Sequence, residues 1–271
     1  MTSENRRRGR PRQSAAHAQQ PSIQALDRAI DVLAVVAAHD GVTLSQIASE
    51  LGQSVATMHR VINSLEQRAM IELSRDSQEW HIGPEAFRLG SAFLRRSNVI
   101  ERSRPVMRQL TAEMGETSNL GIEWEGNVLF VSQIETHQFI RAFFRPGTVS
   151  PFHASGIGKA LLSMYDLPRT RAVLQQSGFE AFTANTILTA DALLVELDII
   201  RRKGFAVDNE ERAKGMRCIA APILNGFGEP VAGLSISGPT ERLPDAHIDT
   251  IGGKVKEAAQ QISSLLGLLK G

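Results

Sequence analysis

The sequence has a single cysteine, Cys218, among 271 residues. One cysteine excludes an intramolecular disulfide framework and a structural zinc site built from several cysteines. The sequence also lacks any apolar run of about 18 residues, the minimum for an ordinary membrane-spanning helix. Its N-terminus is basic but has no apolar stretch of the kind that a secretory signal needs. We therefore expect a protein of the reducing cytoplasm with no membrane partner.

The formal net charge of the protein is also small, only +1 at pH 7. The charge is nevertheless uneven, because residues 1–12 contain five arginines and one glutamate. Residues 13–100 contain seven basic and nine acidic residues. Taken alone, such a basic tail is commonly a solvated, disordered segment. The length of 271 residues and a hydrophobic content of 42% favour two packed domains.

Three helical patterns follow the tail. In the first, apolar residues recur at the 3.6-residue spacing of one helix face: Ile23, Leu26, Ile30, Leu33 and Ala37. Thr43 and Gln46 form a capping box ahead of a short second helix, which Gly52 ends. A third helix within residues 55–68 carries its apolar face at Met58, Ile62 and Leu65. Two helices joined by a turn that contains glycine match the helix-turn-helix pattern.

A predicted β-hairpin follows the three helices. Its strands, Ile71–Ser74 and Trp80–Ile82, flank a polar turn and would form a wing. The alternative is a small helical packing module without a DNA role. DNA binding is favoured because polar side chains suited to bases and phosphates lie on or before the third helix: Gln53, Ser54, Thr57, His59, Arg60 and Asn63.

The basic tail compensates for the acidic balance of residues 13–100. Phosphate neutralisation supplies much of the affinity of a DNA-binding protein, and these residues alone provide little of it. Arg8 and Arg10 stand in an extended RGRP segment, which can lie in a narrow minor groove where arginine is favoured. We therefore interpret residues 1–21 as a DNA-binding arm and residues 22–83 as a winged helix-turn-helix domain.

The remaining residues predict a linker and a second domain. Residues 84–98 form a linker helix, and Pro105 interrupts or restarts the helix before Gly115 ends it. From Ser118 onward, strands alternate with helices in residues 99–271. This mixture predicts an α+β domain built around an antiparallel sheet. Its strands are expected at 118–124, 128–134, 139–144, 205–208, 217–224 and 231–237, with a last helix near 244–269.

The segment Gly156-Ile157-Gly158-Lys159 has some likeness to a phosphate-binding loop. His153 stands where that motif requires its first glycine, and Ala160 stands where it requires serine or threonine. We therefore exclude a nucleotide site. Two glycines at the start of a helix instead leave backbone N–H groups free to hold a small carboxylate. The alternative is a simple tight turn into a helix.

Three small polar side chains stand on two neighbouring predicted strands. Ser235 and Ser237 are two residues apart, so their hydroxyls face the same side of their strand. If Cys218 points to that side too, the three groups converge on one cavity; otherwise the serines face solvent. Cys218 could also be combined with His153 and Asp208 into a thiol hydrolase. A lone cysteine in an apolar run is, however, typically a buried small hydrophobe.

Several motifs together resemble the IclR family of bacterial transcription regulators: TLSQIASELGQSVATMHRVINSL, the wing ending in WHIG, HASGIGKALL, and DNEERAKGMRCIAAPI with GLSISGP. The resemblance covers residues 22–270, and the last two motifs are quite specific. It implies a winged helix-turn-helix, a linker helix and a GAF-like effector domain, assembled as a dimer or a dimer of dimers. The subgroup it looks most like includes glyoxylate-responsive allantoin repressors, and relatives that control γ-butyrolactone and succinate semialdehyde catabolism are also similar.

The resemblance also implies an effector site. Backbone groups of Gly156 and Ile157 would meet the effector carboxylate, beside the side chains of Asp208, Cys218, Ser235 and Ser237. Two residues depart from close relatives, since Ile157 replaces alanine and Met216 replaces leucine. Both changes concern the apolar wall of the site and hence its size selectivity.

We therefore predict a homo-oligomeric, cytoplasmic repressor of a small-molecule catabolic operon. Its partners would be double-stranded operator DNA and a small organic acid or semialdehyde of the glyoxylate, pyruvate or succinate semialdehyde class. No catalytic residue, metal site or cofactor is expected. One rival is an enzyme that acts on the same metabolite through Cys218, whose thiol could add to an aldehyde. The other is an architectural DNA-binding protein without a ligand.

Overall fold

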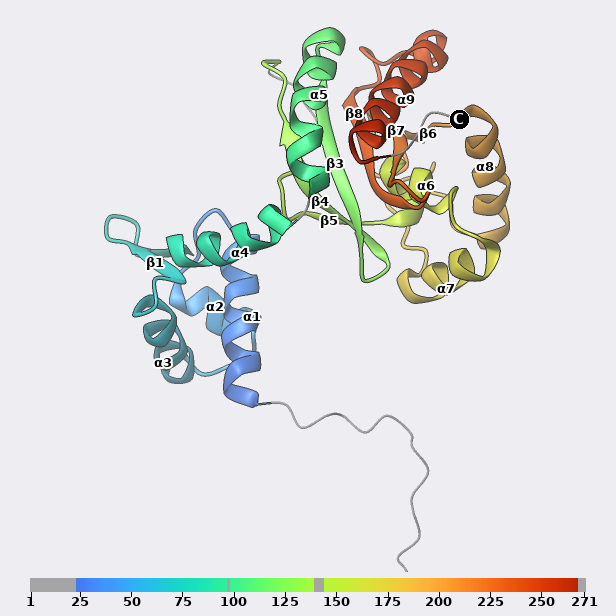
Figure 1. The fold of residues 1–271 in the computed structure, drawn as a ribbon. Helices are drawn as coiled ribbons and strands as arrows, with labels where there is room; N and C mark the ends of the chain where they lie inside the picture. Colours follow the sequence, from blue (N-terminus) through green and yellow to red (C-terminus); the bar gives the residue numbers. More distant parts are fainter. Residues whose placement is uncertain (1–22, 97, 139–143, 268–271) are drawn as a thin grey trace, which may run out of the picture. The chain divides into compact units, whose positions relative to one another are not determined.

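The computed structural model describes residues 23–96, 98–138 and 144–267 (Figure 1). These residues form two compact units that divide between Phe93 and Leu94. Arg8 and Arg10, and most of the strand predicted at 139–144, lie outside the described residues. Within the described residues, no helix has the length and apolar character needed to cross a membrane.

The first unit consists of three helices and a hairpin, as the sequence predicts: α1 (Gln24–Ala38), α2 (Leu44–Glu50), α3 (Val55–Glu66), β1 (Ile71–Ser74) and β2 (Glu79–Ile82). Met58, Ile62 and Leu65 of α3 are buried in its core, as their spacing predicts. Val42 pairs with Trp80 of β2 through an antiparallel bridge, which ties the hairpin to the helices. The predicted winged helix-turn-helix is therefore formed.

The buried face of α1 differs from the predicted one. Ile23, Leu26 and Ile30 are 69%, 55% and 55% exposed, whereas Val32 and Val36 are fully buried in the core. The helix carries apolar residues on two sides, so periodicity alone could indicate either side. Packing against α2 and α3 buries the side of α1 that carries the two valines, which stand one turn apart.

The second unit is built on a six-stranded antiparallel sheet in the order β5-β4-β3-β8-β7-β6. Most strands match the prediction, while the short β5 was missed. Their bounds are β3 (Thr117–Trp124), β4 (Asn127–Ile134), β5 (Val149–Pro151), β6 (Ala206–Asn209), β7 (Met216–Leu224) and β8 (Pro230–Pro239). Helix α4 (Pro84–Arg96) belongs to the first unit as far as Phe93 and continues into the second. The other helices of the second unit are α5 (Asn98–Met114), α6 (Gly156–Leu162), α7 (Leu167–Ser177), α8 (Ala190–Lys203) and α9 (Ile248–Leu265), with short 3-10 turns η1 (Phe152–Ala154) and η2 (Asp245–His247).

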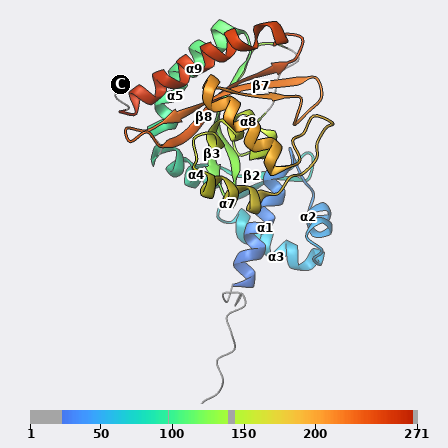
Figure 2. The same ribbon diagram turned by 90° about the vertical axis from the view of Figure 1, so that its right-hand side faces the viewer.

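Helices cover the two faces of this sheet (Figures 1 and 2). Helices α5 and α9 lie side by side on one face, over a core that includes Leu120, Ile219 and Ile236. Helices α6, α7 and α8 contribute to a second core with Val128 and Ala220 of the opposite face. Because side chains alternate along a strand, residues next to Ile219 and Ile236 in sequence face the α6 side. That alternation determines which polar groups lie beneath α6.

Pro105 lies inside α5 rather than at a break or at a helix start. A proline in a helix interior removes one backbone hydrogen bond and typically costs about 3 kcal/mol. Helix α5 continues through it because the flanking side chains of Val99, Val106, Met107 and Leu110 are buried against the sheet. Burial of four such side chains, each contributing about 1.5–3 kcal/mol, outweighs that loss.

Candidate DNA-reading helix and effector site

The turn between α2 and α3 is held by two helix caps. The Thr43 hydroxyl accepts a hydrogen bond from the Gln46 N–H at 3.4 Å, and the Gln46 side-chain oxygen accepts one from the Thr43 N–H at 2.9 Å. This is the predicted capping box. Gly52 follows α2 with φ of +59°, in the left-handed region that favours glycine. The hydroxyl of Ser54 then caps α3 by accepting from the Thr57 N–H at 3.2 Å.

The outer face of α3 presents the predicted DNA-reading residues. Gln53, Ser54, His59 and Arg60 are exposed, and Thr57 and Asn63 are half-buried. Two internal contacts order these side chains, since Ser54 and Thr57 share a hydroxyl hydrogen bond at 2.8 Å and Asn63 Nδ2 lies 3.3 Å from His59 Nδ1. Within the described part of the chain, no acceptor contacts the Arg60 guanidinium, which leaves it available for a phosphate or a guanine.

A hollow of about 700 Å³ lies between α1 and α3 and includes Arg60 in its lining. Its apolar walls include Leu26 and Ile30, the residues of α1 that the core leaves exposed, together with Met70. The apolar stripe predicted for α1 therefore faces this hollow and solvent.

The predicted effector-site residues meet across three neighbouring strands. The register pairs Asp208 of β6 with Cys218 of β7, and Cys218 with Ser237 of β8. Ser235 lies two residues before Ser237 on the same face, and all four side chains are buried. The two serine hydroxyls therefore share a face, as predicted, and the alternative that they face solvent is wrong.

Asn119 of β3 extends this polar row and was missed by sequence reasoning. Its Nδ2 donates to the Ser237 hydroxyl at 3.2 Å, and its Oδ1 accepts from Gln133 Nε2 at 3.1 Å. Asn119 is fully buried opposite Ser235 in the strand register. A buried polar residue in the middle of the strand SNLGIEW was the available signal. In contrast to Ser237, Ser235 has a buried hydroxyl without a nitrogen or oxygen partner among the described residues; both hydroxyls face the Cys218 thiol and act to lower its pKa.

Helix α6 begins directly against this row, as the loop-to-helix prediction requires. A Cβ added at Gly156 would lie 2.9 Å from Cys218 Sγ, so only glycine lets the helix start approach the thiol this closely. The Ser155 hydroxyl caps the helix by accepting from the Gly158 N–H at 3.3 Å. The first backbone N–H groups of a helix have no partner inside it. Those of α6 therefore begin beside Cys218.

Ile157 is fully buried between the sheet and the α6 layer. Gly121 and Gly233 face each other in the β3–β8 register, and added Cβ atoms there would lie 3.2 and 2.6 Å from Ile157 Cγ2. The two glycines thus make room for the isoleucine. Met216 is half-buried at the start of β7, on the same strand face as Cys218.

Burial and neighbouring charge keep Cys218 in its thiol form. Burial, followed by the negative charge of Asp208, raises the pKa of Cys218 to about 11. His153 makes no hydrogen bond to it, because its Nε2 lies 2.9 Å from the Glu180 carbonyl oxygen and its Nδ1 has no hydrogen-bond partner among the described residues. Burial lowers the pKa of His153. This geometry lacks the ion pair or hydrogen-bonded base that activates a catalytic cysteine.

Comparison with known proteins resolves the class of the protein. The family model described as the IclR helix-turn-helix domain matches residues 25–74, and the one described as bacterial transcriptional regulator IclR C-terminal matches residues 91–264. The chain belongs to the IclR family. The resemblance predicted from the motifs is confirmed, and IclR membership makes the chain a transcription regulator rather than an enzyme.

Individual IclR relatives match along almost the whole chain. The HTH-type transcriptional regulator BhcR of Paracoccus denitrificans is 48% identical over 266 residues, covering 97% of this chain and 95% of the relative. The HTH-type transcriptional repressor AllR of Escherichia coli is 34% identical, covering 98% of both chains. The crystal structure of Thermotoga maritima IclR has a TM-score of 0.76 at 28% identity, covering 90% of this chain and 99% of that one. The predicted fold class is thereby confirmed.

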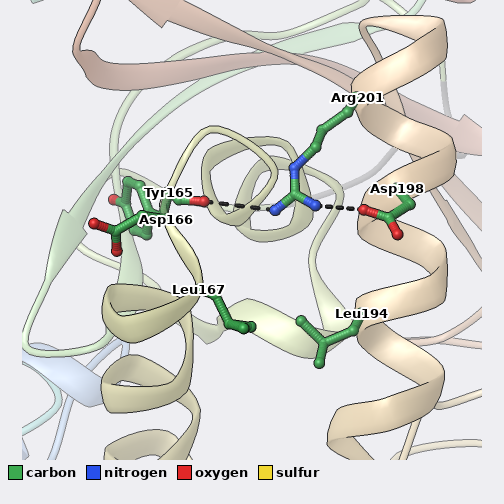
Figure 3. Close-up of a pocket in the computed structure, with 6 residues that line it drawn as sticks. All are labelled: Tyr165, Asp166, Leu167, Leu194, Asp198 and Arg201. Atoms are coloured by element: carbon green, nitrogen blue, oxygen red, sulfur yellow. Dashed lines mark hydrogen bonds and ion pairs between the residues drawn. The ribbon is translucent and has the colours of Figure 1, made fainter.

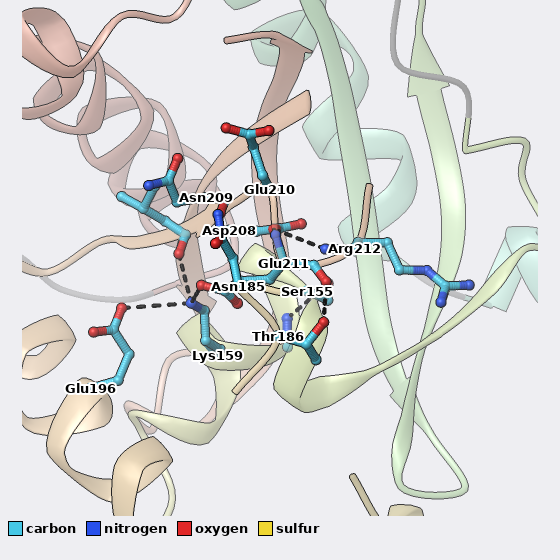
Figure 4. A network of polar contacts seen from close by, with 12 residues as sticks. Ser155, Lys159, Asn185, Thr186, Glu196, Asp208, Asn209, Glu210, Glu211 and Arg212 are labelled. Atoms are coloured by element: carbon cyan, nitrogen blue, oxygen red, sulfur yellow. Dashed lines mark hydrogen bonds and ion pairs between the residues drawn. The ribbon is translucent and has the colours of Figure 1, made fainter. Parts of the chain in front are cut away.

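A buried charged cluster adjoins the candidate effector site of this IclR protein (Figure 4). Lys159 of α6 is fully buried, and its Nζ donates to the Val207 carbonyl oxygen at 2.6 Å and to Glu211 Oε1 at 2.5 Å. Asp208 Oδ1 accepts from the Glu211 N–H at 2.8 Å. Sequence reasoning missed this cluster. Its signal was a lysine surrounded by apolar residues in GIGKALL, which indicates a buried anionic partner.

A second hollow, of about 450 Å³, lies between the start of α7 and α8 (Figure 3). Arg201 crosses it, donating to the carbonyl oxygens of Ser163 at 2.8 Å and Tyr165 at 3.5 Å and pairing with Asp198. Its lining contains none of the predicted site residues: Tyr165, Asp166, Leu167, Leu194, Asp198 and Arg201. Within the described ranges, no group of three or more His, Cys, Asp or Glu side chains could hold a metal ion.

Proposed function

We propose that this IclR protein is a cytoplasmic repressor of a small-molecule catabolic operon, released or strengthened on its operator by a small carboxylate or semialdehyde. The observation that carries the effector part is the buried row Asp208, Cys218, Ser237 and Ser235 beneath the first turn of α6. Repression is supported by AllR, a relative at 34% identity that is named a transcriptional repressor.

The chemistry of the row suits a small oxo acid. The buried Ser235 hydroxyl can donate one hydrogen bond, and the Ile157 N–H in the first turn of α6 can donate another to a carboxylate. The Gly158 N–H is already held by the Ser155 hydroxyl, and the Gly156 N–H points to the Cys218 sulfur. Ile157 fills the space beside these donors, which favours two- to four-carbon ligands over bulky ones. This supports the glyoxylate, pyruvate or succinate semialdehyde class. The thiol of Cys218, with its raised pKa, serves as a polar wall rather than a nucleophile.

DNA reading is assigned to α3 and the two residues before it. Its proposed contacts are Gln53, Ser54, Thr57, His59, Arg60 and Asn63, with Arg8 and Arg10 of residues 1–21 as a minor-groove arm. Ser54 also caps α3, so its hydroxyl positions the helix as well as facing DNA. Residues 22–83 would form the DNA-binding domain and residues 84–98 the linker helix. Residues 99–271 would bind the effector and assemble the protein into a homodimer or a dimer of dimers.

The effector acts, in this proposal, by preferring one arrangement of paired DNA-binding domains. A ligand that binds two arrangements equally shifts nothing, so its contacts must differ between them. Helix α4 joins the two units in sequence and is the proposed coupling element. The enzyme rival has no support, since Cys218 has neither a partner base nor a lowered pKa.

Fluorescence anisotropy with labelled duplexes that tile the DNA upstream of its own gene tests the proposal. Each titration is repeated with glyoxylate, pyruvate and succinate semialdehyde. Arg60→Ala should weaken specific binding by about 1–3 kcal/mol and reduce the salt dependence by about one phosphate contact. Arg171→Ala, an exposed change on α7, is the matched control. Wild-type affinity in the Arg60→Ala protein would exclude α3 as the reading helix.

The effector part is tested in the same assay with Ser235→Ala. Loss of one donor should raise the effector concentration needed for half of the response by about 5- to 150-fold, the equivalent of about 1–3 kcal/mol. Operator affinity without effector should stay unchanged. Ser177→Ala removes a hydroxyl that bonds only within α7, at 3.0 Å from Val173 O, and serves as the control. An architectural protein without a ligand would bind its operator equally with and without all three compounds.

A further inference from the structure

The Lys159–Glu211 pair is unusual because it buries a cation and a carboxylate in the interior of the second unit. Lys159 is fully buried and Glu211 is 6% exposed. Two of the three Lys159 donors are used by Val207 O and Glu211 Oε1, and the nearest oxygen of Glu196 is 3.6 Å away, beyond hydrogen-bond range. Buried charges persist in proteins only where they are paired and hydrogen-bonded.

Glu211 is only half satisfied by this pairing. Its Oε1 accepts from Lys159, but its Oε2 is buried without a hydrogen-bond partner among the described residues. Protonation removes the uncompensated negative charge from that oxygen and leaves a neutral hydroxyl, which costs less to bury than an ionised oxygen. Burial raises the pKa of Asp208 as well, but its Oδ1 accepts the backbone N–H groups of Glu211 and Arg212 at 2.8 and 3.4 Å, and these bonds oppose that rise.

Negative groups are in excess around Glu211. Arg212 is the second cation, and its guanidinium lies over the Phe182 ring at 3.8 Å. His153 of η1 faces Lys159 and Arg212, and its lowered pKa keeps it neutral. The charged groups that face Glu211 are Lys159 from α6, Glu196 from α8 and Asp208 from β6, and Arg212 faces Asp208.

We propose that an anionic effector binds together with one proton, which is held on Glu211 Oε2, and that Lys159 is the residue that positions this carboxyl group. This inference rests on the proposed effector site, because Asp208 belongs both to that site and to the cluster. The proton comes from solvent and neutralises one carboxylate as the effector brings in another. The net charge of the buried region therefore stays the same.

In the effector-free protein, the Glu211 carboxyl group gains or loses this proton near neutral pH. Burial, with smaller contributions from the carboxylates of Asp208 and Glu196, raises the pKa of Glu211 to about 7 against the opposing effect of Lys159. An effector anion next to Asp208 adds a further negative charge and raises that pKa again. Effector affinity should then be constant well below pH 7 and fall by up to about tenfold per pH unit above it. Carboxylic acids have pKa values of about 4, so an oxo-acid effector itself does not titrate there.

Isothermal titration calorimetry of the full-length protein with pyruvate, glyoxylate and succinate semialdehyde, without DNA, tests this inference. Each titration is run at pH 6 and pH 8 in two buffers with different ionisation enthalpies, so that the difference in heat counts the protons taken up. About one proton per bound anion is expected at pH 8, and a much smaller fraction at pH 6. Binding at pH 8 without proton uptake would overturn the inference and leave the proposed function intact. No binding of either acid or of succinate semialdehyde would overturn both.

Glu211→Gln identifies the group that holds the proton. The glutamine mimics the protonated carboxyl, so its proton count should fall to near zero and its affinity at pH 8 should approach that of the wild type at pH 6. Glu257→Gln, an exposed change on α9 across the sheet, should keep the wild-type proton count. Uptake of a full proton by Glu211→Gln would transfer the role to another group and refute the assignment. If Glu211→Gln does not fold, the wild-type proton counts still decide whether the linkage exists.

Discussion

The close approach of α6 to β7 predicts a specific energetic coupling between Gly156 and Cys218. The methyl group of Gly156→Ala would lie 2.9 Å from Cys218 Sγ, 3.2 Å from Cys218 O and 3.4 Å from the Ala220 Cβ. Optimal contact between non-bonded heavy atoms is about 3.5–4.0 Å. The helix start must therefore move away from the sheet by several tenths of an ångström, in a region where the neighbouring apolar side chains are buried.

Overpacking of this kind typically costs about 1–3 kcal/mol. Cys218→Ala removes the nearest of the three atoms, and by itself should cost about 1–2 kcal/mol as a buried large-to-small change. In the double variant the new methyl group occupies the space that the sulfur leaves. We therefore expect the double variant to be more stable than the sum of the single effects by about 1–2 kcal/mol.

Urea denaturation of the full-length wild type, both single variants and the double variant, followed by circular dichroism, measures this coupling. The denaturant slope must be equal among the four proteins for the comparison to hold. Penalties that add within about 0.5 kcal/mol would refute the inferred contact between the α6 start and Cys218. The double variant should also remain weak in effector response, since its restored packing does not restore the thiol in the polar row.

Three further predictions concern stability. Gly252→Ala would place a methyl group 2.5 Å from the Phe205 ring and should lower the free energy of unfolding by about 1–3 kcal/mol. At the neighbouring position, the methyl group of Gly253→Ala meets nothing within 4 Å and should stabilise α9 by about 0.5–1 kcal/mol. Equal urea midpoints for the two variants would contradict this prediction. Thr43→Ala removes the capping box of α2 and should cost about 1 kcal/mol in thermal unfolding, and an unchanged midpoint would speak against the cap. The pKa of Glu211 is raised from 4.5 to about 7, so its protonation stabilises the fold at low pH and this stability is lost as pH rises from about 4.5 through 7. Relative to the wild type, Glu211→Gln should therefore gain up to about 3 kcal/mol of unfolding free energy across that range, and parallel pH profiles from urea denaturation would exclude the raised pKa.

The two faces of the second unit's sheet divide its tasks. One face, with Leu120, Ile219 and Ile236, packs a mainly apolar core against α5 and α9, and its buried Ser118 hydrogen-bonds to Thr111 of α5 at 2.8 Å. The opposite face carries the polar row and meets α6, whose first turn approaches it through Gly156. A ligand that moves α6 would therefore act on the layer formed by α6, α7 and α8 without disturbing the apolar core under α5 and α9.

Local patterns in the sequence determined much of this protein. The capping box at Thr43, the spacing of Met58, Ile62 and Leu65, and the alternation of Ser235 and Ser237 depend only on contacts between residues close in the chain. Helical and extended backbones impose these periods on any sequence, so the patterns can be read without knowing the tertiary structure. The helix-turn-helix and the shared face of the two serines were therefore predictable.

Only the tertiary structure decided which of several compatible contacts form. Strand register, not spacing, sets Cys218 between Asp208 and Ser237, and packing decided which side of α1 is buried and allowed α5 to continue through Pro105. Lys159 and Glu211 stand 52 residues apart, and nothing local links them. Such contacts depend on the burial free energy of the whole unit, which pairs distant residues and shifts their pKa values once water is excluded.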